Sequence, residues 1–488
     1  MLLGVALENF KCFGDRQVAT LAPITLIYGP NSGGKSSILQ ALLLLKQSLV
    51  NREHVLTLRG PHRDASSFRS LIFGQNLEHK MSISLRYAPS VDAMGESNQE
   101  RLLAGKDTSR SLGFRWSCQG DEGMGEDERV ELDGFSCMVA GDPELDLHLA
   151  LSDEFGYGAL GKVLVPVSGD SYESLFDFTK HLRSDRGMES CEPPDPTFLF
   201  FTPEGLVPVA QSPALADVAD WMSAYDLDDP NDLERAEADL STYGLSPFTE
   251  SLSTEFRWVS ESIEHIGPAR FPADIHVDEE GLAGRLPSSS QLGYLNAWLK
   301  RFDLPYLLEL EKVRHDRLKA ILLVLVDVRT GARCALKDVG FGVSQILPIL
   351  MKGRQDLYAQ QRKTILVEQP ELHIHPKLQA ELADFFLASS GLVDDDPGNP
   401  PDDEGLADFF RSHHQWIIET HSEALVLRLQ RRIREGKVKP EDVSILYVRP
   451  TGERGSEILQ LRLDDDGEFL DEWPDGFFEE SYREMFAH

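Results

Sequence analysis

The sequence predicts an α/β fold with a long inserted α+β region, and three observations point to it. An apolar strand at residues 24–28 runs into a glycine-rich loop and then into a helix. From residue 336 to residue 448, apolar strands alternate with helical segments, as they do in layered α/β folds. Residues 88–255, between these parts, are rich in Asp, Glu, Gly and Ser and show little periodicity, which indicates an insertion.

The first element is a loop at residues 29–36 that reads GPNSGGKS and fits G-x-x-x-x-G-K-[ST], the phosphate-binding loop of nucleotide triphosphatases. Its glycines let backbone N–H groups approach phosphates, and the helix N-terminus adds a favourable dipole. The alternative, an ordinary glycine-rich turn, leaves the flanking strand and helix unexplained. The pattern predicts that Lys35 reaches the β- and γ-phosphates of a nucleotide and that the Ser36 hydroxyl binds Mg²⁺. The nucleotide-binding residues predicted here are Asn31, Ser32, Gly33, Gly34, Lys35, Ser36 and Ser37.

The second element is an apolar strand at residues 364–368 that ends in a carboxylate and continues as Gln369-Pro370-Glu371. A magnesium–nucleotide site needs such a carboxylate opposite the loop, so Glu368 is predicted to hold Mg²⁺ directly or through water. A helix is expected from Pro376 to about residue 389. His373 and His375 are expected to pack and hydrogen-bond around the turn, because a metal site would need a third ligand.

Two further segments complete the pattern. Residues 416–422 form a strand that ends in Glu-Thr-His-Ser, and His421 there can hydrogen-bond a γ-phosphate and sense its loss, although a strand-end histidine can also be structural. Residues 338–345 place glycines at the start of an apolar helix, where free N–H groups make an anion site. The alternative for this segment is a turn that closes the preceding hairpin.

Composition narrows the classes of function. The net charge of −33 weighs against sequence-independent DNA binding, which needs clustered Lys and Arg. A basic cluster does occur at residues 428–439, and a solvated helix face is its favoured interpretation. The five cysteines are scattered, which indicates a reducing, cytoplasmic setting. The longest apolar run, residues 320–326, is too short for a membrane span, and no signal peptide is expected.

These four segments, in this order, resemble ABC-type ATPases, and more narrowly the class that contains SMC heads, RecF heads and the overcoming-lysogenization-defect (OLD) ATPases. Residues 7–13, LENFKCF, are similar to the opening N-F-K strand of that class. The resemblance implies an ABC-type P-loop ATPase head, a mixed sheet with flanking helices, in which two heads sandwich ATP and Mg²⁺. It also implies that His421 is the switch histidine and that Gln345 and Glu371 lie at the dimer face. It adds Lys11 as a further nucleotide contact. It also implies that Gly340, Gly342 and Ser344 contact the nucleotide bound to the second head.

The sequence departs from that class at two positions. Gln369 stands where most ABC ATPases carry the glutamate that polarises water, and an amide cannot accept a proton. Glutamine can still orient a water, and Glu371 or His421 is the alternative base, so slow hydrolysis is expected. Gly340 stands where the signature usually has serine, so the contact in trans is expected to use backbone N–H groups or Ser344. The predicted catalytic residues are Glu368, Gln369, Glu371 and His421.

The resemblance also sets expectations for organisation. Residues 1–87 are predicted as the N-terminal lobe of the ATPase head, 88–255 as an acidic inserted domain, 256–450 as the C-terminal lobe and 451–488 as a C-terminal extension. Three segments look like one bacterial subfamily that carries an uncharacterised C-terminal domain and often occurs in anti-phage systems. They are residues 368–373 (EQPELH), Gly267-Pro268 with Arg270, and residues 473–478 (WPDGFF).

The function that the resemblance implies is a slowly hydrolysing ATP switch in the cytoplasm. It would form a homodimer or a higher even oligomer and control a separate effector protein, expected to be a nuclease, in anti-phage defence. The alternatives are a RecF- or SMC-like DNA-repair ATPase and an ATP-binding scaffold that does not hydrolyse. DNA binding stays open at this stage.

Overall fold

The structure is a computed structural model of the 488-residue chain. It describes residues 1–50, 56–62, 64–88, 109–119, 129–139, 146–152, 163–166, 199–200, 256–268, 277–278, 287–315, 318–335, 338–353, 362–394, 397 and 413–474. Most of the predicted insertion, Arg270 and residues 475–488 lie outside this set. The chain divides into two compact units. The first is Met1–Ala19, Ser37–Ile263 and Pro450–Glu457, and the second is Thr20–Ser36, Glu264–Arg449 and Ile458–His488.

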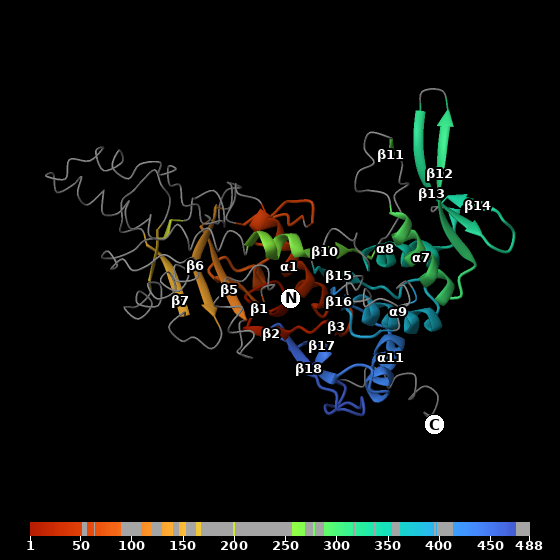
Figure 1. Ribbon diagram of the computed structural model, residues 1–488. Helices are drawn as coiled ribbons and strands as arrows, with labels where there is room; N and C mark the ends of the chain where they lie inside the picture. Colours follow the sequence, from red (N-terminus) through yellow and green to blue (C-terminus); the bar gives the residue numbers. More distant parts are fainter. Residues whose placement is uncertain are drawn as a thin grey trace, which may run out of the picture. The chain divides into compact units, whose positions relative to one another are not determined.

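The first unit is built on an eight-stranded sheet in the order β2-β1-β4-β5-β6-β7-β8-β9 (Figure 1). Neighbouring strands from β1 to β9 pair antiparallel, including β4 with β5, so one sheet contains strands on both sides of residues 87 and 88. Its strands are β1 (Leu2–Glu8), β2 (Gln17–Thr20), β4 (Met81–Tyr87), β5 (Arg110–Gln119), β6 (Arg129–Val139), β7 (Asp146–Ser152), β8 (Val163–Pro166) and β9 (Leu199–Phe200).

The second unit is built on a six-stranded sheet in the order β10-β15-β16-β3-β17-β18 (Figure 1). The four central strands are parallel, and β3 and β16 are buried at every position, as strands covered on both faces are. The α/β class predicted from the sequence is confirmed. The strands are β3 (Ile24–Tyr28), β10 (Ile263–Ile266), β15 (Thr364–Glu368), β16 (Gln415–Glu419), β17 (Val443–Pro450) and β18 (Ser456–Leu461).

A smaller sheet of β11 (Val277–Asp278), β13 (Leu318–Asp327) and β12 (Tyr306–His315), with β14 (Arg333–Ala335) on β13, also belongs to the second unit. The longest apolar run of the sequence, residues 320–326, lies within β13. The labelled helices are α1 (Lys35–Val50), α7 (Ser289–Arg301), α8 (Phe341–Lys352), α9 (Pro376–Ser389) and α11 (Glu423–Arg434).

Local sequence explains where the helices near the sheet begin. Pro376 occupies the first turn of α9, and the His375 ring accepts a hydrogen bond from the Lys377 N–H at 3.2 Å. Ser422 caps α11 by accepting from the Leu425 N–H at 3.3 Å. The apolar helix predicted at the glycines of residues 338–345 is α8, which begins at Phe341, directly after Gly340.

Aromatic side chains fill the space between these helices and the parallel strands. The rings of Trp298 on α7 and Phe385 on α9 meet edge to face, with centroids 5.1 Å apart. Phe386 packs on Trp416 of β16 at 4.8 Å. All four side chains are buried, so this core fixes the parallel strands whose carboxyl ends carry the polar residues described next.

Candidate nucleotide-binding site

The glycine-rich loop lies between β3 and α1, as the sequence predicts. Gly29 begins it with a φ of 142°, a backbone conformation that side chains with a Cβ rarely adopt. A Cβ at this position would lie 2.2 Å from the carbonyl oxygen of Val448 on β17. Glycine is therefore required where the chain leaves the sheet, because β17 lies too close for any side chain.

Lys35 is folded into this loop and is 4% exposed. Its Nζ donates to the carbonyl oxygens of Gly29 at 3.0 Å and Pro30 at 2.9 Å. Burial lowers the pKa of Lys35, and the carboxylates of Glu419 and Glu371 raise it. The ammonium group is thus held at the centre of the loop, among groups that a phosphate oxygen can replace.

Ser36, the next residue, donates from its hydroxyl to Oε1 of Glu419 at 2.9 Å. Glu419 ends β16 and is 5% exposed. Within the described part of the chain, its second oxygen, Oε2, is buried and has no hydrogen-bond partner. Burial raises the pKa of Glu419, the hydrogen bond from Ser36 lowers it, and the nearby carboxylate of Glu368 raises it again.

Glu368 ends the neighbouring strand β15, in register with Glu419. Its Oε1 lies 2.8 Å from Nε2 of His265 on β10, and both side chains are about a fifth exposed, at 21% and 22%. The carboxylate predicted to hold Mg²⁺ therefore lies next to Glu419 at the same edge of the sheet, with a histidine as its partner on the side of β10.

Glu371 holds the residues that follow β16. Its Oε2 accepts from the Thr420 hydroxyl and its Oε1 accepts from the His421 backbone N–H, both at 2.7 Å. Gln369 has a φ of 46°, and its N–H donates to the Glu419 carbonyl oxygen at 2.7 Å. These bonds tie the end of β15 to the end of β16 and fix the backbone on both sides of the two carboxylates.

His421 lies at the tip of this arrangement. Burial lowers its pKa, and the charge of Lys35 lowers it further, so the imidazole is neutral at pH 7. A neutral imidazole both donates and accepts hydrogen bonds, which suits a group that contacts phosphate or water.

His375 instead caps α9. Within the described residues, no group of three or more His, Cys, Asp or Glu is arranged to hold a metal ion.

The remaining predicted contacts are Gly340, Gly342, Ser344, Lys11 and Ser37. Gly340 is the N-cap of α8 and makes no side-chain cap hydrogen bond. A Cβ at Gly342 would lie 3.4 Å from the carbonyl oxygen of His373, so this helix start rests against the turn after β15, and Ser344 is buried in its first turn. Lys11 and Ser37 belong to the first unit, where Lys11 donates to Gln40 and the Cys12 thiol lies 3.7 Å from the Ser37 hydroxyl.

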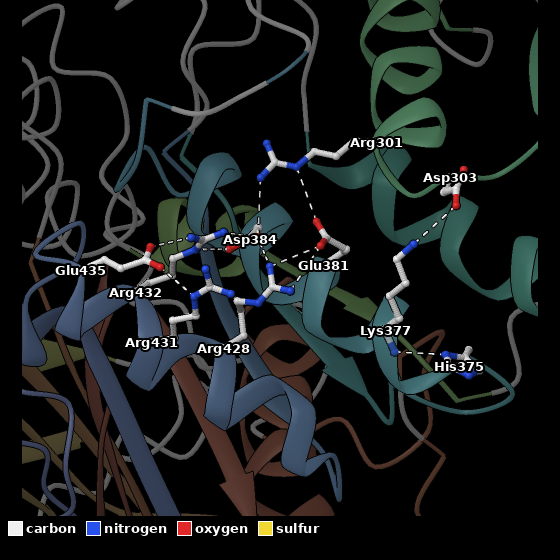
Figure 2. Close-up of polar contacts among 10 residues, drawn as sticks. All are labelled: Arg301, Asp303, His375, Lys377, Glu381, Asp384, Arg428, Arg431, Arg432 and Glu435. Carbon is white, nitrogen blue, oxygen red and sulfur yellow. Dashed lines mark hydrogen bonds and ion pairs between the residues drawn. The ribbon is translucent and has the colours of Figure 1, made fainter.

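The basic cluster on α11 is largely neutralised within the chain (Figure 2). Arg428 and Arg432 are mostly buried and bind Asp384 on α9, while Arg431 pairs with Glu435. The sequence favoured a solvated helix face, but two of the arginines are instead committed to a buried carboxylate. Further pairs join Arg434 to Glu468, Lys437 to Glu435 and Lys439 to Glu441.

The side chains around the loop fit a nucleotide with Mg²⁺. The glycine-rich loop leads into the N-terminus of α1, where backbone N–H groups favour a phosphate, and Lys35 supplies positive charge. Ser36 and the unpartnered oxygen of Glu419 offer hard oxygen ligands, and Mg²⁺ takes few protein ligands when it is bound with phosphates.

Across the described residues, every helix is too short or too polar to span a membrane.

Sequence reasoning did not assign a role to Glu419 or to His265. Glu419 was visible as the last residue of an apolar strand, but its position beside Ser36, which lies 383 residues earlier in the chain, depends on the order of the strands in the sheet. His265 lies on a short strand 103 residues before Glu368, and its local sequence gives no signal for this pairing.

Comparisons with known families match three parts of the chain. Residues 284–426 match the model of an AAA ATPase domain, and residues 5–49 match that of an AAA domain. Residues 438–487 match a family described as a protein of unknown function (DUF3696). No curated protein shows a significant match.

Solved structures of SMC heads are similar to the chain at low identity. They include an SMC head bound to the C-terminal winged-helix domain of ScpA, with 11% identity, coverage of 95% of this chain and 98% of that one, and a TM-score of 0.42. An SMC head domain from Thermotoga maritima has 9% identity, coverage of 95% of this chain and 99% of that one, and a TM-score of 0.37. The third is an SMC head with an extended coiled coil, bound to the C-terminal domain of ScpA from Pyrococcus furiosus. It has 10% identity, coverage of 94% of this chain and 96% of that one, and a TM-score of 0.40.

The two AAA matches between them contain the glycine-rich loop, β15 and β16. Two segments of the chain thus resemble AAA ATPase domains, and between them they contain Lys35, Ser36, Glu368 and Glu419.

Proposed function

We propose that this protein is an ATP-binding, slowly hydrolysing molecular switch that dimerises through its ATPase heads and controls a separate effector. The observation that carries the proposal is the Ser36–Glu419 hydrogen bond beside the buried Lys35, which brings a phosphate-binding loop and a carboxylate strand into one site. The AAA matches over both segments support ATP as the nucleotide.

In this proposal, backbone N–H groups of the loop and the Lys35 ammonium bind the phosphates. Mg²⁺, when bound, supplies positive charge that offsets the charge of the phosphate oxygens. Ser36 and a carboxylate from β15 or β16 hold it. Thr420 and His421 are positioned by Glu371, and the neutral His421 hydrogen-bonds the terminal phosphate or the attacking water.

Slow hydrolysis is expected because Gln369 follows Glu368 at the position where a general base would stand. Its amide orients water but accepts no proton. Glu371 is a weak substitute in this geometry, since both of its oxygens already accept hydrogen bonds from Thr420 and His421. ATP would thus persist long enough in the closed dimer to act as a signal.

Control of an effector in anti-phage defence is the finer part of the proposal, and it rests on the family resemblance of residues 368–373 and 473–478. A RecF-like repair ATPase is less well supported, because the arginines of α11 are engaged with acidic side chains of the same chain. A cytoplasmic location and an even number of heads belong to the same proposal.

Two measurements test it. Equilibrium binding of a fluorescent ATP analogue with Mg²⁺ should be clear for the wild type and lost in Lys35→Ala, whereas Lys377→Ala, an exposed lysine outside the site, should bind as the wild type does. Gln369→Glu should raise steady-state turnover by about 10²-fold, the contribution of a well-placed general base. Absence of ATP binding by the wild type would refute the proposal. Fast wild-type turnover that depends on Glu371 would refute the assigned role of Gln369.

A further inference from the structure

The site contains two strand-end carboxylates, and the geometry distinguishes them. We infer that Glu419, rather than Glu368, is the protein carboxylate that binds the nucleotide's Mg²⁺ directly, together with the hydroxyl of Ser36. This inference rests on the proposed function, since it assumes that the loop binds a triphosphate. It assigns a metal-ligating role to a residue on the strand of the switch histidine.

Strand order gives the first argument. In the sheet, β16 lies between β15 and β3, and β3 leads into the loop. Glu368 is in register with Glu419, and Glu419 is in register with Ile27 of β3. Neighbouring strands are about 4.8 Å apart, so the Glu419 backbone is one spacing from the loop strand and the Glu368 backbone is about 10 Å from it.

The hydrogen bond to Ser36 gives the second argument. At 2.9 Å, the hydroxyl oxygen and Oε1 of Glu419 are already side by side, and the hydroxyl uses its proton in this bond. The lone pairs of both oxygens remain available to one cation. Mg²⁺ prefers a compact set of hard oxygen ligands with little rearrangement, and this pair provides two of them.

The buried, unpartnered oxygen of Glu419 gives the third argument. Among the described residues, Oε2 has no hydrogen-bond partner although Glu419 is 95% buried. A carboxylate oxygen removed from water without a partner is costly, and a bound cation supplies what is missing. Glu368 and Glu371 add negative charge nearby, while Lys35 adds one positive charge, so the surroundings favour a divalent cation.

Glu368 is engaged differently. Its Oε1 pairs with His265 at 2.8 Å, on the side of β10, the strand farther from the loop. A carboxylate held by a histidine in this way suits a positioning residue, which orients metal-bound water from one strand further out. The two glutamates therefore have different roles although both end a strand: Glu419 binds the metal ion and Glu368 positions water.

The test compares Glu419→Gln with Glu368→Gln, using Glu441→Gln, an exposed glutamate outside the site, as the matched control. Binding of a fluorescent ATP analogue is measured across a series of Mg²⁺ concentrations and also in EDTA. For Glu419→Gln, the Mg²⁺ concentration that gives half-maximal binding should rise by at least about tenfold, as for loss of a metal-ligand contact. In EDTA this variant should bind ATP more tightly than the wild type does, because a carboxylate beside the phosphates has been neutralised.

Glu368→Gln should shift the Mg²⁺ requirement less, and Glu441→Gln should leave it unchanged. A larger shift in Glu368→Gln than in Glu419→Gln overturns the inference. So does weaker binding by Glu419→Gln both with Mg²⁺ and in EDTA, which is the signature of a damaged site. A wild type that binds ATP while Glu419→Gln keeps a normal Mg²⁺ requirement refutes this inference alone. A wild type that binds no ATP refutes the proposed function and this inference with it.

Discussion

Replacing Asp384 with Asn should loosen the helical layer that packs on the parallel sheet. Asp384 lies on α9 and is 4% exposed. Arg432 of α11 donates to both of its oxygens at 2.7 Å, Arg428 donates to Oδ2, and Arg301 of α7 lies 3.6 Å from Oδ2 (Figure 2). One carboxylate thus joins three helices, and its charge balances guanidinium groups that are themselves mostly buried.

The magnitude follows from what the substitution leaves behind. Asparagine keeps the shape of the side chain but removes the charge and places an amide N–H₂ against guanidinium groups. Removing one partner of a buried ion pair costs about 3–5 kcal/mol, because the remaining charge stays buried. Since about 1.4 kcal/mol corresponds to a tenfold change in an equilibrium constant, the opening equilibrium of α9 and α11 should rise by roughly 10²- to 4 × 10³-fold.

Hydrogen exchange of the slowest amides in α9 and α11 measures this opening locally, which suits a chain with two units. The matched control is Asp303→Asn, the same chemical change at a side chain that is 85% exposed and pairs with Lys377 at 3.4 Å. Loss of that exposed pair should cost less than about 1 kcal/mol. Equal exchange rates in the two variants would refute the claim that burial makes the Asp384 pairs important.

The remaining predictions concern a buried histidine and the entry to the loop. Burial lowers the pKa of His414 to about 4 from 6.5, so between these values the unfolded chain binds more protons and stability falls as the pH falls. The wild type should lose thermal stability between pH 6.5 and pH 4.5 more steeply than His414→Asn, which keeps an acceptor for the Lys363 N–H; parallel slopes would contradict this. Gly29→Ala should weaken ATP binding by about tenfold or more, because its Cβ would lie 2.2 Å from the Val448 carbonyl oxygen. Gly436→Ala, which shares a positive φ but meets no atom within 4 Å, should bind ATP normally, and equal losses in the two variants would point to backbone strain alone.

Much of the fold could be predicted from local sequence. The strand before the loop, the strand that ends at Glu368 and the helix that begins at Pro376 all occur with the expected bounds. Each is specified by neighbouring residues: continuous apolar runs for buried parallel strands, and proline for a first helical turn. Such signals depend on a few consecutive positions, so the sequence alone carries them.

The sheet of the first unit was harder to foresee. Residues 88–255 show little periodicity and suggested a separate insertion, yet β5 and β6 extend over Arg110–Gln119 and Arg129–Val139 and continue the sheet of β1 and β4. In β5, the apolar residues Leu112, Phe114 and Trp116 alternate with Gly113 and Arg115, but this short pattern lies in a segment that is otherwise rich in Asp, Glu, Gly and Ser. Pairing with β4 supplies the stabilisation that local propensity does not.

The assignment of roles within the site required the strand order. Both Glu368 and Glu419 end apolar strands. The sequence predicted Glu368 as the magnesium carboxylate, because it precedes Gln369 in the motif that resembles ABC-type ATPases. Only the placement of β16 between β15 and β3 shows that Glu419 is the nearer neighbour of Ser36. That placement depends on contacts across most of the chain length, which a local pattern does not encode.

The arginine-rich helix α11 shows the same limit for charge. In the sequence, residues 428–439 form a basic cluster for which a solvated helix face is the favoured interpretation, and a contact with DNA phosphates would have to use these side chains. In the structure, Arg428 and Arg432 would first have to leave Asp384, which would leave a buried carboxylate without its cations. Exposed Arg431 would also have to leave Glu435. On a chain of net charge −33, this face is therefore better suited to holding α9 and α11 together than to tracking DNA.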